Sequence, residues 1–371
     1  MVSPARLSTH ADTATSLALL SDRDLTDLMA SGTPAGTGIG GRATLLEVDG
    51  VRVFVKQVPL TDIELEPDNV RSTANLFDLP PHLHYGIGAI GSPGFGAWRE
   101  LAVHEMTTDW VRSGSFPGFP LLHHWRVLPG IPQPLPEALA DVERAVAYWG
   151  GSPGLRERVE ALRTASASLT LFLEYVPHTL HDWFSAQLRT HNAELACVLV
   201  EQGLEAVTGF LREQRHLIHF DAHFGNILTD GHRLYLTDYG LSLSSRFQLS
   251  AQERDFETRH HRYDRAYALS YLVHWLVVDQ YGLARDERED FIRTCADGNR
   301  PEGIPEAAAA LISRHARLAA VVGDFNRRLE QESRLTPYPH DEVDALSPDA
   351  VSAGSSTMSS SRASTLGSSG K

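Results

Sequence analysis

The feature that most constrains this chain is a set of three polar residues arranged around a short hairpin. Asp221 and Asn226 lie in one polar segment, and Asp238 follows Asn226 after twelve positions. Between them, Asp230-Gly231 joins two apolar runs, and an Asp-Gly pair in that context is a strong hairpin signal. Because a hairpin brings its two strand ends together, the sequence predicts that Asn226 and Asp238 lie side by side.

These three side chains suit phosphoryl transfer. That chemistry needs a carboxylate to position and deprotonate an attacking hydroxyl, and oxygen ligands for the magnesium that bridges the phosphates. Asp221 suits the first role, and Asn226 and Asp238 suit the second. A purely structural alternative makes Asp221 and Asn226 turn residues and Asp238 a helix cap.

The same segment also allows a metal interpretation. His219 and His223 are spaced as in the zinc-binding motif HExxH. Phe220, however, occupies the place of the catalytic Glu. An Asp between the two His residues and a Gly two residues after the second do not suit the helix that this motif requires.

The segment resembles the catalytic machinery of the protein kinase-like superfamily. His219, Asp221 and Asn226 match its HxDxxxxN loop, and the DYG turn that begins at Asp238 matches its DFG turn. The combined pattern is specific, and the resemblance covers roughly residues 36–276. It implies that ATP and Mg²⁺ are bound, with Asp221 as the base and with Asn226 and Asp238 as the metal ligands.

A glycine-rich segment before this region fits the same family. Gly36, Gly38 and Gly41 form a GxGxxG pattern, whose backbone can approach phosphates closely. The pattern leads into a predicted hairpin that ends in an apolar strand carrying Lys56, as the VAIK strand does in kinases. A second GxGxxG at residues 86–91 follows no convincing strand and leads into a proline, so a plain turn is the better interpretation.

By the resemblance, Lys56 holds the α- and β-phosphates of ATP. A lysine in an apolar strand calls for a carboxylate partner, because an unpaired buried charge is costly. The family pattern puts this partner on the next helix, where Glu100 and Glu105 are the candidates. They are five residues apart and cannot both face inward. The spacing to the following Pro-containing loop favours Glu105.

A third segment resembles the kinase hinge, whose backbone binds adenine. It ends with Glu174 and Val176, and the following helix start carries Asp182 at the position of a ribose-binding acid. We therefore expect Glu174, Val176 and Asp182 to contribute to the nucleotide site. The alternative is an ordinary strand followed by a helix cap.

Three departures from the protein kinase pattern bear on the acceptor. Phe220 replaces the Arg of the HRD triplet, no APE motif is present, and Ser250 opens a capping box soon after the DYG turn. These departures, and His223 in the catalytic loop, resemble small-molecule kinases such as aminoglycoside and choline kinases. Ser242, Ser244 and Ser245 are the obvious candidates for a phosphorylation switch.

The sequence therefore leaves three functional hypotheses. The leading one is a bacterial-type protein kinase that transfers the γ-phosphate of ATP to Ser or Thr hydroxyls. The second is a small-molecule kinase. The third is a pseudokinase that binds ATP as a signalling module, and the intact set Lys56, Asp221, Asn226 and Asp238 argues against it.

The predicted fold class is α+β, with a two-lobed protein-kinase-like arrangement. A helical extension spans residues 1–35, and a small antiparallel N-lobe spans 36–176 with insertions at 57–97 and 130–165. A mainly helical C-lobe follows at 177–334. A Ser-rich tail at 335–371, with almost no large apolar side chains toward its end, is predicted to be disordered.

The charge balance and the cysteine content narrow the class of protein and its partners. A net charge of −14 argues against nucleic acid or anionic membrane as a partner. Cys197 and Cys295 form no CxxC pair, which fits a reducing cytosol. No signal peptide is recognised, and the longest apolar stretch, residues 266–278, is too short to span a bilayer. We expect a cytoplasmic enzyme whose oligomeric state the sequence leaves open.

Overall fold

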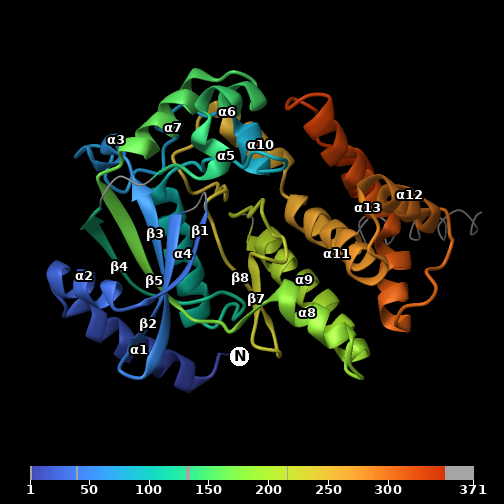
Figure 1. The fold of residues 1–371 in the computed structure, drawn as a ribbon, viewed down its shortest axis with the longest axis horizontal. Coiled ribbons are helices and arrows are strands. Elements are labelled where there is room, and N and C mark those ends of the chain that lie inside the picture. Colours follow the sequence, from blue (N-terminus) through green and yellow to red (C-terminus); the bar gives the residue numbers. More distant parts are fainter. Residues whose placement is uncertain (1, 39–40, 131–133, 215, 347–371) are drawn as a thin grey trace, which may run out of the picture.

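The computed structural model describes residues 2–38, 41–130, 134–214 and 216–346. One part of the chain is built on a five-stranded antiparallel sheet, and the other is mostly helical (Figure 1). This arrangement confirms the predicted α+β class.

The sheet has the strand order β1-β2-β3-β5-β4, and every neighbouring pair is antiparallel. Asp49 and Gly50 turn the chain between β2 and β3 with φ angles of 51° and 79°, the left-handed conformation that a type I′ hairpin needs. Lys56 on β3 lies opposite Leu171 on β5. The strands are β1 (Thr33–Gly38), β2 (Gly41–Val48), β3 (Val51–Leu60), β4 (Leu122–Pro129) and β5 (Ala167–Glu174).

Helices cover both faces of this sheet. Successive side chains of a strand point to opposite faces, so Leu171 and Leu173 pack toward one helix while Phe172 packs toward the N-terminal helices. On the first face Trp98 and Leu101 fill the core. The helices involved are α4 (Ala97–Arg112) on the first face and α1 (Pro4–Ala18) and α2 (Asp22–Ala30) on the second.

The two predicted insertions pack against each other and form a small core of their own. Phe77 from the first contacts the same apolar cluster as Trp149 and Leu155 from the second. A buried ion pair of 2.8 Å between Arg158 and Glu64 also joins them. Their elements are α3 (Asp62–Leu65), η1 (Pro81–Tyr85), α5 (Glu137–Ala140), α6 (Val142–Tyr148) and α7 (Pro153–Thr164). The first insertion was expected from residue 57, but β3 continues to Leu60.

The helical part has the largest apolar core, centred on α11 between α9 and α13. A small sheet, β6-β7-β8, lies at its boundary with the five-stranded sheet. No helix in the described ranges combines the length and apolar character needed to cross a membrane. The elements are β6 (His178–Thr179), α8 (Leu180–Leu188), α9 (Ala193–Gln214), β7 (Ile227–Thr229), β8 (Leu234–Leu236), α10 (Ala251–Arg259), α11 (Tyr263–Tyr281), α12 (Arg285–Ala296), α13 (Glu306–Gln331) and α14 (His340–Ala345).

The prediction of a disordered tail over residues 335–371 is wrong for its first twelve residues. Tyr338 and Val343 are buried in the core of the helical part, and residues 340–345 form α14. Two large apolar side chains are enough to dock this segment onto α13 and α11. The Ser-rich remainder, residues 347–371, lies outside the described residues.

Candidate functional site

The β7–β8 hairpin brings the predicted site residues together. Ile227 pairs with Leu236, and the N–H of Thr237 donates to the carbonyl oxygen of Asn226 at 3.0 Å. Asp221, Asn226 and Asp238 all line one cavity of about 310 Å³, which we call the central cavity. The side-by-side placement predicted from the Asp-Gly turn is therefore confirmed.

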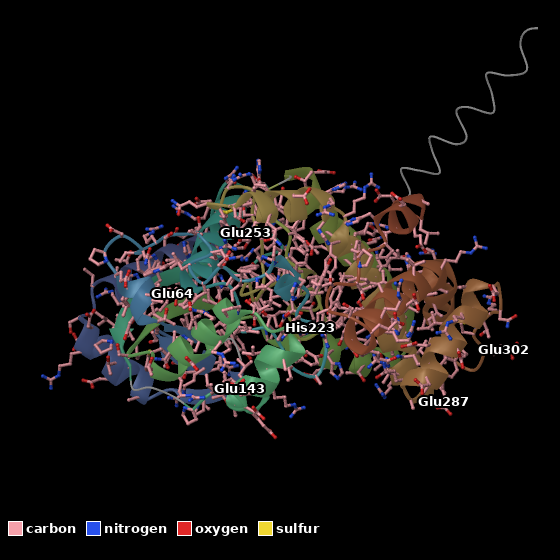
Figure 2. All side chains as sticks on the ribbon, turned by 90° about the horizontal axis from the view of Figure 1, so that it is seen from above. Glu64, Glu143, His223, Glu253, Glu287 and Glu302 are labelled. Atoms are coloured by element: carbon pink, nitrogen blue, oxygen red, sulfur yellow. The ribbon has the colours of Figure 1, made fainter. Side chains whose placement is uncertain are left out.

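The central cavity lies where the two parts of the chain meet. Its walls come from the end of β3, from residues 91–96, from α4 and from the loop that carries Asp221. In Figure 2, His223 of this loop is near the middle of the molecule, between the sheet-containing part and the C-terminal helices.

The loop that carries Asp221 has a strained backbone that one carboxylate holds in place. Phe220 has a φ angle of 67°, in the left-handed region that non-glycine residues rarely adopt. Asp264 on α11 accepts hydrogen bonds from the backbone N–H groups of His219 and Phe220 at 2.8 and 2.9 Å. Burial raises the pKa of Asp264 to about 6, although these two bonds favour its charged form.

Sequence reasoning missed Asp264. The one signal available was an acidic residue at the edge of the long apolar stretch. Strain of this kind persists only where surrounding contacts enforce it, and it clusters at functional sites. Asp264 therefore holds the loop that carries Asp221 in its strained conformation.

His219 is a structural member of the loop. The N–H of Asp221 donates to Nδ1 of His219 at 3.1 Å, so the ring proton is on Nε2, which donates to the carbonyl of Thr237 at 2.9 Å. Burial lowers the pKa of His219 to about 4 and keeps it neutral. Both ring nitrogens are thus engaged, and the described residues contain no group of three or more His, Cys, Asp or Glu side chains arranged to hold a metal.

The carboxylate of Asp221 is partly buried. The side-chain amide of Asn226 donates to its Oδ2 at 3.0 Å, and Nε2 of His223 lies 3.8 Å from its Oδ1. Burial raises the pKa of Asp221, and the nearby charge of Asp238 adds to this, while His223, Asn226 and Lys56 oppose it. A carboxylate with a raised pKa is suited to accept a proton.

Lys56 lies at the centre of the charge network. Its Nζ is 2.7 Å from Oε1 of Glu100 and 2.9 Å from Oδ1 of Asp238. Burial opposes the charge of Lys56, but these two carboxylates raise its pKa above the ordinary value. Burial by itself would raise the pKa of Asp238, yet the charge of Lys56 holds this pKa down to about 2. Both groups therefore stay charged.

The prediction that Glu105 pairs with Lys56 is wrong. Glu105 instead forms an exposed ion pair of 2.6 Å with Arg71, and Glu100 points into the cavity. The rotation of α4 decides this. Trp98 faces the sheet core, and Arg99 forms a buried ion pair of 2.7 Å with Glu253 at the start of α10. The next residue, Glu100, is thereby directed at Lys56.

The first glycine-rich segment forms the β1–β2 hairpin. Gly36 and Gly38 belong to β1, Gly41 begins β2, and Gly38 pairs with Gly41. A Cβ on Gly41 would lie only 2.0 Å from the carbonyl oxygen of Gln57, so only glycine fits there. The two residues between Gly38 and Gly41 lie outside the described residues.

The hinge-like segment has an ion pair that the sequence did not suggest. Glu174 ends β5 and binds Arg6 of α1 through both carboxylate oxygens at 2.7 Å. Val176 is nearly buried, and among the described residues no hydrogen bond is made by its N–H group. Asp182 is exposed and caps the start of α8 with Thr179, which matches the alternative of an ordinary helix cap.

The second glycine-rich segment lies against the site. Nδ1 of His84 donates to the carbonyl of Leu241 at 2.7 Å, and the His84 ring stacks on Phe95 with 3.7 Å between centroids. A Cβ on Gly94 would lie 3.1 Å from the carbonyl oxygen of Gly240. Residues 84–96 therefore form a wall over the DYG turn, a role that the sequence pattern did not reveal.

The three serines after the DYG turn differ in exposure. Ser242 and Ser244 are buried, and the hydroxyl of Ser244 donates to the carbonyl of His216. Ser245 is exposed. Of the three candidates for a phosphorylation switch, only Ser245 is accessible to a kinase.

Comparison with known proteins adds no identity to this site. No family model matches the chain, and no curated protein is detectably similar to it.

The donor set of the central cavity fits magnesium bound together with phosphates. Asp238 has a side chain that is 41% exposed, and only its Oδ1 contacts Lys56. Asn226 donates through its amide nitrogen to Asp221, which leaves its amide oxygen free to ligate. Magnesium is usually bound by one or two protein oxygens together with substrate phosphates and water. Two oxygen ligands are therefore enough.

Proposed function

We propose that this chain is an ATP-dependent phosphotransferase of the protein kinase-like superfamily. The observation that carries the proposal is the ion-pair network of Lys56. Three segments far apart in the sequence supply Lys56, Glu100 and Asp238, whose charges contact one another, and the two carboxylates line one cavity with Asp221 and Asn226. Positioned charges of this kind are what phosphoryl transfer requires.

The architecture supports a two-lobed arrangement of the same type. The small lobe is the five-stranded antiparallel sheet with α4 on one face, and the large lobe is the helical part (Figure 1). The central cavity lies between them. In this arrangement the β1–β2 hairpin with Gly36, Gly38 and Gly41 covers the phosphates of ATP, and Glu174, Val176 and Asp182 lie on the adenosine side.

The chemistry follows from the charges of the site. Lys56 binds the α- and β-phosphates, and Glu100 keeps the lysine charged and oriented. Asn226 and Asp238 would hold Mg²⁺, which neutralises charge on the β- and γ-phosphates. The acceptor oxygen attacks the γ-phosphorus, the bond to the β-phosphate oxygen breaks, and ADP leaves. Asp221 receives the proton that the acceptor hydroxyl loses.

The surroundings of Asp221 favour a small acceptor over a protein hydroxyl. Residues 84–96 lie along the DYG turn and the loop that carries Asp221, and we infer that they restrict the approach of a peptide segment to Asp221. The protein Ser/Thr kinase hypothesis stays a prediction. The pseudokinase hypothesis is disfavoured because Asp221 and Asn226 lie together with the Lys56 network.

A transfer assay tests the proposal. Purified protein is incubated with Mg²⁺ and γ-labelled ATP against pools of proteins and of metabolites, with Asp221→Asn as the control. ATP affinity is measured separately by calorimetry with a non-hydrolysable analogue. Labelled product that depends on Asp221 supports the proposal. Nucleotide binding without turnover would support the pseudokinase hypothesis, and the absence of nucleotide binding would refute both.

A further inference from the structure

A second cavity of about 470 Å³ adjoins the central cavity on the side of the helical part, and we call it the helical cavity. The two cavities share Gly86, Asp221 and His223 among their lining residues. Residues 86–88 form one wall, and α11, α12 and α13 form the others. A volume of this size suits a small molecule, and the molecule would lie directly beside Asp221.

Arg288 on α12 is the arginine of this cavity that forms no ion pair with a described residue, although Glu289 and Glu330 act on its charge without direct contact. Its side chain is half-buried, its buried Nε has no hydrogen-bond partner among the described residues, and no ion pair of Arg288 is seen there. Two of the three acidic side chains of the cavity pair with a neighbouring arginine, since Arg285 lies 2.6 Å from Glu330 and 3.6 Å from Glu289, and the third is Asp221. An arginine cannot lose its charge in a protein, and a partly buried charge without a partner is unfavourable.

Two further polar atoms in the walls lack partners. Nε2 of His274 faces the carbonyl oxygen of Ala319 at 3.4 Å, and burial lowers the pKa of His274 to about 4, so the ring is neutral with Nδ1 as an acceptor. This Nδ1 and Oδ1 of Asn326 are buried and make no hydrogen bond to any described residue. Native proteins rarely leave such atoms unsatisfied. Both are acceptors, and both would be satisfied by hydroxyl donors.

Aromatic rings complete the cavity. Tyr267 and Tyr271 follow each other on one face of α11, with their ring centroids 6.3 Å apart, and Tyr271 lies 6.0 Å from the ring of His223. Neither tyrosine hydroxyl makes a hydrogen bond to a described residue. The cavity thus offers one cation without an ion pair to a described residue, two acceptors without a hydrogen bond to a described residue, and two phenol hydroxyls, and Asp221 lines the same cavity.

We propose that the helical cavity binds the phosphoryl acceptor, and that this acceptor is a small polyhydroxylated molecule with an anionic group that Arg288 binds. The inference rests on the proposed phosphotransferase function and specifies its substrate class. His274 and Asn326 accept hydrogen bonds from the acceptor's hydroxyls, and one further hydroxyl reaches Asp221. That hydroxyl gains the γ-phosphoryl group, its proton goes to Asp221, and ADP is the leaving product.

The first experiment compares acceptors of different charge. Transfer from γ-labelled ATP is measured to gluconate and ribose 5-phosphate, to their neutral counterparts sorbitol and ribose, and to the cation glucosamine. We expect the anionic members to be preferred by at least about tenfold in kcat/KM. Arg288→Met should raise the KM of the anionic acceptor roughly 10- to 100-fold, the usual cost of a hydrogen bond to a charged group, with kcat and the KM of ATP within about threefold.

Arg293→Met is the matched control. Arg293 is on the same helix and does not itself line the helical cavity: it pairs with Asp290 at the surface and lies 3.5 Å from Glu289, a cavity residue that Arg285 also contacts. This variant should leave every constant within about twofold. Equal loss in Arg293→Met and Arg288→Met, or a wild-type preference for neutral, cationic or protein acceptors, would overturn the inference while leaving phosphotransfer intact.

The second experiment needs no knowledge of the true acceptor. Inorganic phosphate is titrated against protein saturated with Mg²⁺ and a non-hydrolysable ATP analogue, so that the Lys56 site is filled, and the thermal midpoint is followed. We expect phosphate to raise the midpoint in wild type and Arg293→Met but not in Arg288→Met. A midpoint rise that is equal in all three, or absent in all three, would contradict an anion site at Arg288. Failure of the analogue itself to bind would instead refute the proposed function.

Discussion

The central cavity and the helical cavity adjoin at Asp221 but treat their charges in opposite ways. In the central cavity, Lys56 contacts Glu100 and Asp238 at once, and each of these charges has a partner. In the helical cavity, Arg288 and His274 keep unpaired polar atoms within the described structure. The charges of the Lys56 network are paired directly, whereas Arg288 forms no ion pair with a described residue.

Under the proposed function, this difference corresponds to two roles: the paired charges of the central cavity would act in the transfer reaction itself, and the unpaired groups of the helical cavity would select the acceptor. Phosphates, Mg²⁺ and the transferred group need charges in fixed positions, and pairing keeps those charges in place before the nucleotide arrives. A cavity that selects one acceptor needs groups that only that acceptor satisfies, because leaving buried polar groups unpaired penalises every other ligand.

The largest effect is expected at Asp238. Asp238→Asn removes the charge of the proposed magnesium ligand and the second partner of Lys56, and should reduce turnover to near background because metal ligation supplies several kcal/mol of transition-state stabilisation. Asparagine tolerates the φ angle of 64° at this position better than alanine. Steady-state turnover and the thermal midpoint are measured together. Turnover within tenfold of wild type in a folded variant would rule out the ligand role.

The next effect is expected at Asp221, where the cavities meet. Asp221→Asn should lower kcat roughly 10²- to 10⁴-fold, the usual range for a general base, with little change in nucleotide affinity. Because the pKa of Asp221 is raised, wild-type kcat/KM should fall as pH drops through a value above the ordinary aspartate range. The Asn variant should lack this fall. An unchanged pH profile in the variant would assign the proton to another group.

A smaller effect should distinguish the two glutamates of α4. Glu100→Gln removes a charge that lies 2.7 Å from Lys56, and we expect a roughly 10- to 100-fold loss in kcat/KM for ATP. Glu105→Gln is the matched control, since its carboxylate pairs with Arg71 at the surface, and should stay within about threefold. Equal losses in both variants would mean that α4 lies in a different rotation when ATP is bound.

The smallest effect concerns the stability of the loop between the cavities. The folded pKa of Asp264, about 6, exceeds the unfolded value, so the folded state binds the extra proton between about pH 4 and 6. The Asp264 contribution to stability should therefore fall as pH rises through this range. This contribution is measured by urea unfolding of wild type and of Asp264→Asn, each at pH 4.5 and at pH 6.5. The difference in unfolding free energy between the two proteins should shift by about 1–2 kcal/mol, and no shift would contradict the raised pKa.

Local chemistry explains most of what could be predicted. Both Asp-Gly turns form where expected, and Ser250 caps its helix through a capping box. Asn226 and Asp238 could be placed together because a single hairpin of about ten residues connects them. Such features depend on residues close in sequence, whose preferences do not need the rest of the fold.

The errors have a common physical origin. Glu100 and Glu105 are both in a helix with apolar residues on several sides, and the packing of Trp98 and Arg99 selects between them. The segment from residue 335 onward was predicted to be disordered with the rest of the Ser-rich tail, yet Tyr338 packs in the core of the helical part. In each case the deciding contact lies far away in the sequence.

The sequence by itself determined the kinds of residue and the local turns: a carboxylate, an amide and a second carboxylate around one hairpin, and a lysine in a strand. Only the tertiary structure decided which charges meet, because Lys56 reaches Asp238 across 182 residues and Arg6 reaches Glu174 across 168. It also decided that residues 84–96 lie over the DYG turn and that Arg288 forms no ion pair within the described part of the chain. Contacts between distant segments depend on how whole helices and sheets pack, and no local pattern encodes that packing.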